Sequence, residues 1–132
     1  MPASPLRDAD LIAFIATRDL SRAKAFYGDL LRLPLISEDQ FGAMFNAHGS
    51  MLRIALVPAA TPVSYTVLGW SVGDIGATVG ELQACGVTME RYERMPQDEL
   101  GIWKSPSGAR VAWFKDPDGN TLSITQFDSS GR

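Results

Sequence analysis

The stretch FKDPDGNTLSI, residues 114–124, carries the strongest structural signal of this chain. Within it, Pro117 presets a φ angle that suits a turn, and Gly119 accepts the positive φ that tight turns often need. Apolar and β-branched residues flank the turn over residues 110–114 and 121–127. The pattern therefore predicts two antiparallel strands joined by the Asp-Pro-Asp-Gly turn.

The first half of the chain contains one predicted helix between strands. The helix starts at Asp19 or Ser21, which are both good N-caps, and Pro34 ends it because proline cannot continue a helix. Apolar runs predict strands over residues 11–16, 41–46 and 51–57, the last two joined by a turn at residues 48–50.

The second half repeats this plan. Asp74 opens a second helix about 55 residues after the first one, and Gly86 ends it. The predicted strands cover residues 66–72, 87–92, 110–114 and 121–127. Each half is expected to run strand–helix–strand–strand–strand, which indicates a duplicated module. We predict a single domain over residues 1–132, with modules at about 9–58 and 65–127 and a linker at about 58–64.

Composition argues against several classes of partner. The 132 residues carry a net charge of −3, and Lys and Arg are spread along the chain. Because no basic patch stands out, we expect neither nucleic acid nor a membrane surface as a partner. No apolar run reaches the roughly 20 residues of a membrane span, and the first residues lack a leader pattern. With a lone Cys85 and no internal disulfide, a cytoplasmic protein is predicted.

Three segments together resemble the vicinal-oxygen-chelate superfamily, the group of glyoxalase I, extradiol dioxygenases and bleomycin-resistance proteins. They are residues 12–27, residues 69–75 and residues 113–124. The resemblance implies an α+β fold in which two βαβββ modules form a curled mixed sheet around a cleft. It also implies a homodimer, either closed or with exchanged modules.

Metal-dependent members of that superfamily place ligands on the first and last strand of each module. In this chain the resemblance puts those positions at Ile12, Ala55 (or its neighbour Leu56), Val67 and Ser123. A catalytic metal needs about three protein ligands, and three of these four side chains have no donor atom. We therefore expect no metal and no cofactor, although a non-standard metal site elsewhere stays open.

The resemblance also implies which strand residues line the cleft. Since side chains alternate along a strand, neighbours two residues away share a face. The predicted wall consists of Ile12, Phe14, Arg53, Ala55, Val67, Gly69, Ser123 and Thr125. The opposite set is expected to pack under the helices: Ile15, Ile54, Leu56, Leu68, Trp70, Leu122 and Ile124.

Three long side chains add chemistry to this wall. Arg53 either grips a carboxylate or phosphate with paired hydrogen bonds or pairs with a nearby acid. Trp103 and Trp113 offer flat apolar faces for stacking on a ligand, or they pack into the core. The sequence leaves both alternatives open.

The segment Glu93–Pro106 has weak periodicity and is predicted to be either a lid or a plain surface connection. Asp98 and Glu99 within it are candidates for a catalytic base or for closing over a cationic ligand. Two functions follow. The first is a protein that binds a small, partly aromatic or anionic molecule. The alternative is a lyase, isomerase or dioxygenase-type enzyme that works without metal or with a non-standard metal site.

Overall fold

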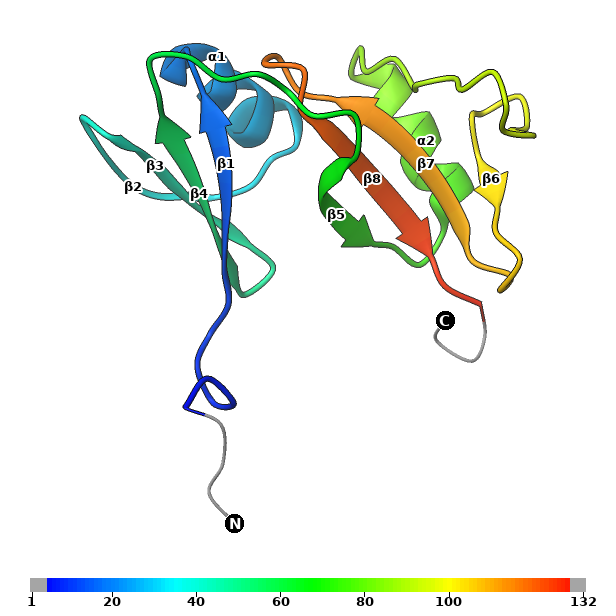
Figure 1. Ribbon diagram of the computed structural model, residues 1–132, viewed down its shortest axis with the longest axis horizontal. Helices are drawn as coiled ribbons and strands as arrows, with labels where there is room; N and C mark the ends of the chain where they lie inside the picture. Colours follow the sequence, from blue (N-terminus) through cyan, green and yellow to red (C-terminus); the bar gives the residue numbers. More distant parts are fainter. Residues whose placement is uncertain (1–4, 129–132) are drawn as a thin grey trace. The chain divides into compact units, whose positions relative to one another are not determined.

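The computed structural model describes residues 5–128 (Figure 1). The chain divides into two compact units, residues 1–60 and residues 61–132. Each unit contains one four-stranded mixed sheet and few helices. This is the predicted α+β class, and each unit follows the βαβββ order.

The first unit begins with β1 (Ile12–Thr17), which leads into α1 (Leu20–Lys24). Asp19 caps this helix, because its side chain accepts a hydrogen bond from the Arg22 N–H at 3.2 Å. The helix continues as the wider π-helical turn η1 (Ala25–Leu30) and stops before Arg32, whose φ is 60°. Three strands follow: β2 (Leu35–Asp39), β3 (Gly42–Ala47) and β4 (Ser50–Leu56).

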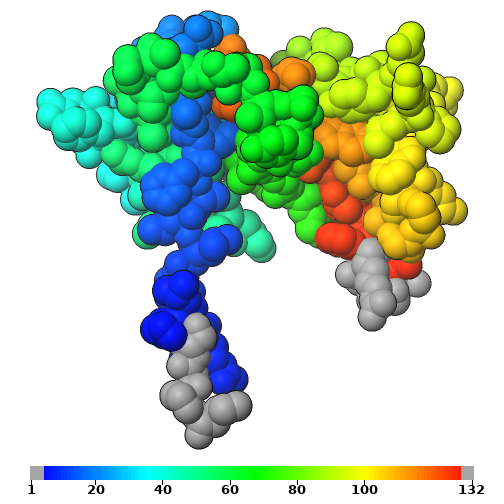
Figure 2. All heavy atoms as spheres, viewed as in Figure 1, coloured from blue at the N-terminus to red at the C-terminus, as the bar shows by residue number. Residues whose placement is uncertain are grey.

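The first sheet has the order β1-β4-β3-β2, and β1 runs parallel to β4. One face carries the core of the unit, where Phe26 and Tyr27 of the helix are buried together with Phe45, Leu52 and Ile54 of the strands. The other face, called the open face below, carries the exposed side chains of Ile12 and Phe14. Figure 2 shows the β2–β3 hairpin, coloured cyan, projecting from its unit, and all five residues of β2 are exposed.

The second unit starts with β5 (Thr66–Ser71) and α2 (Ile75–Ala84). Asp74 caps α2 by accepting from the Ala77 N–H at 3.1 Å, and Gly86, with a φ of 95°, follows its end. The remaining strands are β6 (Trp103–Lys104), β7 (Arg110–Lys115) and β8 (Thr121–Gln126). Their order is β5-β8-β7-β6, and α2 packs on β7 and β8 (Figure 1).

The hairpin predicted from residues 114–124 is confirmed, since β7 and β8 pair antiparallel around the turn. Asp116 organises this turn. Its Oδ1 accepts from the N–H groups of Asp118 and Asn120, both at 2.9 Å, and Gly119 adopts a φ of 86°. The Asp-Pro-Asp-Gly residues therefore hold the backbone, as their types predict.

Two elements differ from the sequence prediction. The repeated plan calls for a strand between the first helix and residues 41–46, but no residue range was predicted for it, because the exposed sequence Leu-Ile-Ser-Glu-Asp of β2 has no alternation. The predicted strand at residues 87–92 is wrong: only Met89 forms a bridge, with Phe114, and the chain then leaves the sheet edge until Trp103. One core assignment is also wrong. Leu56, at the end of β4, is 41% exposed instead of packing under the helix.

No helix within residues 5–128 is both long enough and apolar enough to cross a bilayer.

Candidate functional site

The face of the second sheet opposite α2, called its open face below, brings several predicted wall residues into one row. Trp113 of β7 lies opposite Ser123 of β8, and Ser123 lies opposite Gly69 of β5. A Cβ at Gly69 would lie 2.7 Å from the Ser123 Oγ, so only glycine leaves room for that hydroxyl. Because Gly69 has no side chain and Ser123 a short one, no bulky group stands beside the Trp113 ring in this row.

An aromatic cluster, formed by Tyr92, Trp103 and Trp113, stands on this face. The rings of Tyr92 and Trp113 meet edge to face, with centroids 5.5 Å apart and planes at 82°. The ring centroids of Trp103 and Trp113 are 6.1 Å apart, and the ring planes meet at 37°. The Trp113 indole N–H donates to the Thr66 Oγ1 at 3.1 Å, which fixes this ring in place. The cluster joins a loop and two strands into one wall.

Thr125 and Val67 complete the predicted wall of the second unit. Thr125 lies opposite Val111, which in turn pairs with Trp103, so Thr125 belongs to the row beside the cluster. Val67 sits at an irregularity of β5, between the paired residues Thr66 and Leu68, and is 39% exposed. Both residues are on the surface of the second sheet.

Tyr92 was not predicted as a site residue. Burial raises the pKa of its phenol above the ordinary value, and the negative charge of Glu90 raises it further. The signal in the sequence was the alternation of side chains along this segment. Because Met89 is buried, alternation puts Glu90 and Tyr92 together on the opposite face. That pattern does not reveal a contact with Trp113, which depends on where the chain leaves the sheet.

The first sheet holds the other predicted wall residues. Ile12 and Phe14 are 42% and 67% exposed on its open face, and Arg53 lies opposite Phe14. Ala55 pairs with Gly42 and belongs to the next row of this face.

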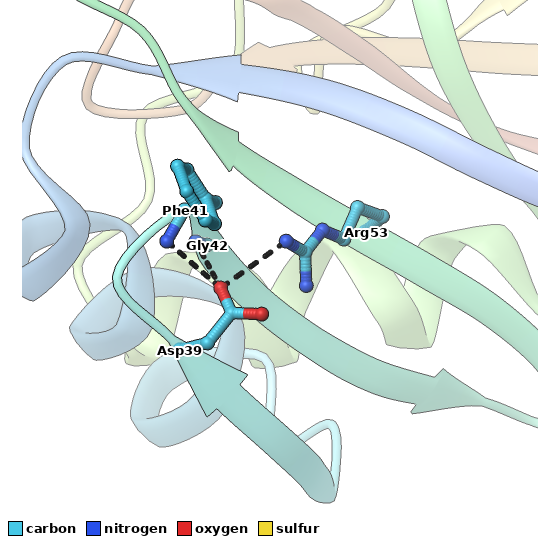
Figure 3. A network of polar contacts seen from close by, with 4 residues as sticks. All are labelled: Asp39, Phe41, Gly42 and Arg53. Carbon is cyan, nitrogen blue, oxygen red and sulfur yellow. Dashed lines mark hydrogen bonds and ion pairs between the residues drawn. The ribbon is translucent and has the colours of Figure 1, made fainter.

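Arg53 has an acidic partner. Its Nη2 lies 3.3 Å from the Asp39 Oδ1, an oxygen that also accepts from the N–H groups of Phe41 at 2.8 Å and Gly42 at 3.1 Å (Figure 3). The Phe41 hydrogen bond lowers the pKa of Asp39 most, burial opposes it, and the Arg53 charge lowers it further. Of the two alternatives for Arg53, the structure therefore has the pair with a nearby acid.

The loop after Glu93 is tied to its unit by side-chain hydrogen bonds to the backbone. Gln97 accepts from the Tyr92 N–H at 2.7 Å and donates to the carbonyl oxygens of Glu90 at 3.0 Å and Gly101 at 2.7 Å. The Arg91 guanidinium donates to the carbonyl oxygens of Asp98 and Glu99. A lid motion of this loop would have to break these bonds.

The two acidic candidates in the loop differ in their surroundings. The Asp98 Oδ1 accepts from the N–H groups of Leu100 and Ile102, both at 2.9 Å, so this carboxylate shapes the turn. Glu99 is exposed. A groove of about 400 Å³ borders Asp98, and it is lined by Pro96, Gln97, Ile102, Lys104 and Arg110 instead of the aromatic rings.

The family model for the Glyoxalase/Bleomycin resistance protein/Dioxygenase superfamily matches residues 10–124. The chain belongs to this superfamily. The resemblance carried by the Asp-Pro-Asp-Gly hairpin and the two helix starts is thereby confirmed.

Solved structures of the superfamily share the fold. A lactoylglutathione lyase from Agrobacterium tumefaciens is 17% identical, with a TM-score of 0.69 over 90% of this chain and 93% of that one. A glyoxalase/bleomycin resistance protein/dioxygenase from Nocardioides is 20% identical, with a TM-score of 0.72 over 96% and 87%. The fosfomycin resistance protein FosX from Listeria monocytogenes is 15% identical, with a TM-score of 0.70 over 92% and 95%. At these identities the likeness shows the fold alone. A comparison with curated proteins found no match.

The metal-ligand positions that the superfamily implies do not fit a metal in this chain. Ile12, Ala55 and Val67 offer only carbon atoms, and Ser123 offers one buried, neutral hydroxyl. A catalytic metal needs about three charged or imidazole ligands. Within residues 5–128, no three His, Cys, Asp or Glu side chains gather closely enough to hold an ion. That the protein works without a metal stays a prediction.

Proposed function

We propose that this chain binds a small, partly aromatic or anionic molecule and that it does so without a metal at the usual superfamily positions. The observation that carries the proposal is the aromatic cluster on the open face of the second sheet. Ligand sites typically combine apolar and aromatic walls with a few polar groups. Thr125 supplies a hydroxyl in the row beside the cluster.

The aromatic part of this proposal has more support than the anionic part. Trp113 is already held by Thr66 and Tyr92, whereas Trp103 is half-buried and, within residues 5–128, its ring contacts the Trp113 ring alone. Arg53, the predicted anchor for an anion, is engaged by Asp39. An anionic ligand would have to compete with that carboxylate.

The alternative function is a lyase, isomerase or dioxygenase-type enzyme with no metal or a non-standard metal site. Such an enzyme needs a base within hydrogen-bond reach of the proton that it removes. Asp98 is engaged in its turn and Glu99 lies exposed in the same loop, so neither supports this alternative. Binding is therefore the function that we favour.

We also propose a cytoplasmic homodimer. Large apolar side chains are exposed on the open face of the first sheet, including Phe14 at 67%, Ile12 at 42% and Met51 at 43%. Monomeric proteins seldom leave a contiguous apolar patch uncovered. Light scattering after gel filtration tests this, and a monomer at micromolar concentration would contradict it.

The binding proposal is tested with quinoline, 2-naphthoate and inorganic phosphate as probes, in calorimetric titrations of the purified protein. We expect the two ring compounds to bind and Trp103→Ala to weaken them about tenfold, which corresponds to about 1.4 kcal/mol. Trp70→Phe is the matched control, because Trp70 stacks on Phe114 at the helix-covered face. The proposal fails if no probe binds or if both substitutions weaken binding equally.

A further inference from the structure

Glu90 lies on the same face of the second sheet as the aromatic cluster. Met89 bridges Phe114 and is buried on the helix side, and the Glu90 N–H donates to the Trp113 carbonyl oxygen at 2.8 Å. These two contacts put Glu90 directly opposite Trp113. Because successive side chains of an extended segment point to opposite faces, the Glu90 side chain is on the open face. The half-buried residue brings a carboxylate to the face that carries the aromatic cluster.

Three polar groups around the cluster have no protein partner. Within residues 5–128, no hydrogen bond or ion pair engages the Tyr92 hydroxyl, the Trp103 indole N–H or the Glu90 carboxylate. The Trp113 indole differs, since Thr66 accepts its proton at 3.1 Å. In the described part of the chain the Glu90 carboxylate therefore has no positive protein group to pair with. A ligand that carries a positive charge would supply one.

The nearest positive side chains do not neutralise the charge of Glu90 next to the aromatic rings. Lys115 belongs to the same face, but its Nζ lies toward β8, 3.5 Å from the Thr121 Oγ1. The Arg91 guanidinium is held by the backbone carbonyls of Asp98 and Glu99. Burial raises the pKa of Tyr92, and the Glu90 charge adds to that increase, so the field of Glu90 reaches the phenol.

We propose that the aromatic cluster and Glu90 together select a flat ring that carries a positive charge, such as an N-alkylated heteroaromatic cation. The faces of Trp and Tyr rings attract cations, and Trp does so best. Glu90 adds a full negative charge next to those rings. This inference rests on the proposed function, because it names the charge class of the ligand that binds at the cluster.

Three ring compounds of the same size separate charge from stacking: 1-methylquinolinium, quinoline and 2-naphthoate. Calorimetric titration at pH 8 and low salt, where quinoline is neutral, gives the three affinities. We expect the cation to bind about fivefold tighter than quinoline and 2-naphthoate to bind weakest. Added salt should reduce the preference for the cation, because screening weakens the Glu90 charge.

The variant Glu90→Gln keeps the shape of the side chain and removes its charge. We expect it to lose the preference for 1-methylquinolinium over quinoline. Lys115→Gln is the control of opposite charge, and it should keep the preference. Thermal unfolding of each variant checks that its fold is intact.

The outcomes distinguish this inference from the proposed function. If 2-naphthoate binds as tightly as the cation, or if the preference survives in Glu90→Gln, the charge selection is wrong while ring binding stands. If none of the three rings binds, the proposed function fails and the inference falls with it. If Glu90→Gln does not fold, the wild-type affinities for the three rings still test whether the site prefers a cation.

Discussion

The contact between Gly69 and Ser123 makes a quantitative prediction about the candidate site. The substitution Gly69→Ala adds a Cβ that would lie 2.7 Å from the Ser123 Oγ and 3.4 Å from the Ser123 carbonyl oxygen. The second distance is an ordinary contact, so the hydroxyl carries nearly all of the strain. Removing that hydroxyl with Ser123→Ala should therefore remove the cost of the new methyl group.

The magnitude follows from what the serine can do. Turning its side chain off a staggered rotamer costs about 0.5–1.5 kcal/mol, and overpacking a filled site costs about 1–3 kcal/mol. We expect Gly69→Ala to lower the free energy of unfolding by about 1–3 kcal/mol in the wild-type background. In the Ser123→Ala background the same change should cost less than about 0.5 kcal/mol, because the clashing hydroxyl is absent. Replacing glycine by alanine also stabilises the protein slightly, since it makes the unfolded chain less flexible.

Urea unfolding followed by tryptophan fluorescence suits this double-mutant cycle. All three tryptophans belong to the second unit, so their signal reports on the unit that contains the contact. Gly80→Ala is the control, since a Cβ there has no atom within 4 Å and lies in a helix. An equal cost of Gly69→Ala in both backgrounds would refute the reasoning, as would a cost no larger than that of Gly80→Ala.

Three further predictions concern stability and pH. A Cβ at Gly42 would lie 2.1 Å from the Ile54 carbonyl oxygen, so Gly42→Ala should cost more than about 3 kcal/mol in urea unfolding followed by circular dichroism. The pKa of Asp39 is below its unfolded value of 3.8, so its stabilisation is present above that pH and lost below it. The difference in unfolding free energy between wild type and Asp39→Asn should therefore shrink as the pH falls below 3.8, and a constant difference would contradict this. The raised pKa of Tyr92 makes its stabilisation fade as the pH rises above 10.0, and ultraviolet titration of Tyr92→Phe should lack one tyrosine that ionises above pH 10.0.

The elements with strong local signals could be predicted from the sequence. Asp19 and Asp74 cap their helices because a short carboxylate reaches the free N–H groups of the first turn. Alternation also separated the two faces of the strands, with Ile15 and Ile54 buried while Phe14 is exposed. These features depend on residues close together in the chain, which is why pattern reasoning finds them.

Segments with weak or misleading local signals were mispredicted. The strand β2 is held by its pairing with β3, although its own residues are all exposed. Residues 87–92 have the alternation of a strand, with Val87 and Met89 buried. The loop around Gln97 nevertheless draws the chain away from β7, because its side chain bonds three backbone groups.

The candidate site shows the same division. The sequence by itself determined which superfamily pattern the chain follows and that three of the four usual ligand positions lack donor atoms, and it offered Trp103 and Trp113 as candidates for stacking on a flat ligand. Only the tertiary structure decided that Arg53 pairs with Asp39 and that Glu90 and Tyr92 join the tryptophans. The physical reason is sequence distance. Caps, turns and alternation act over a few residues, whereas these contacts join residues from separate strands and loops, and pairing register alone sets which of them meet.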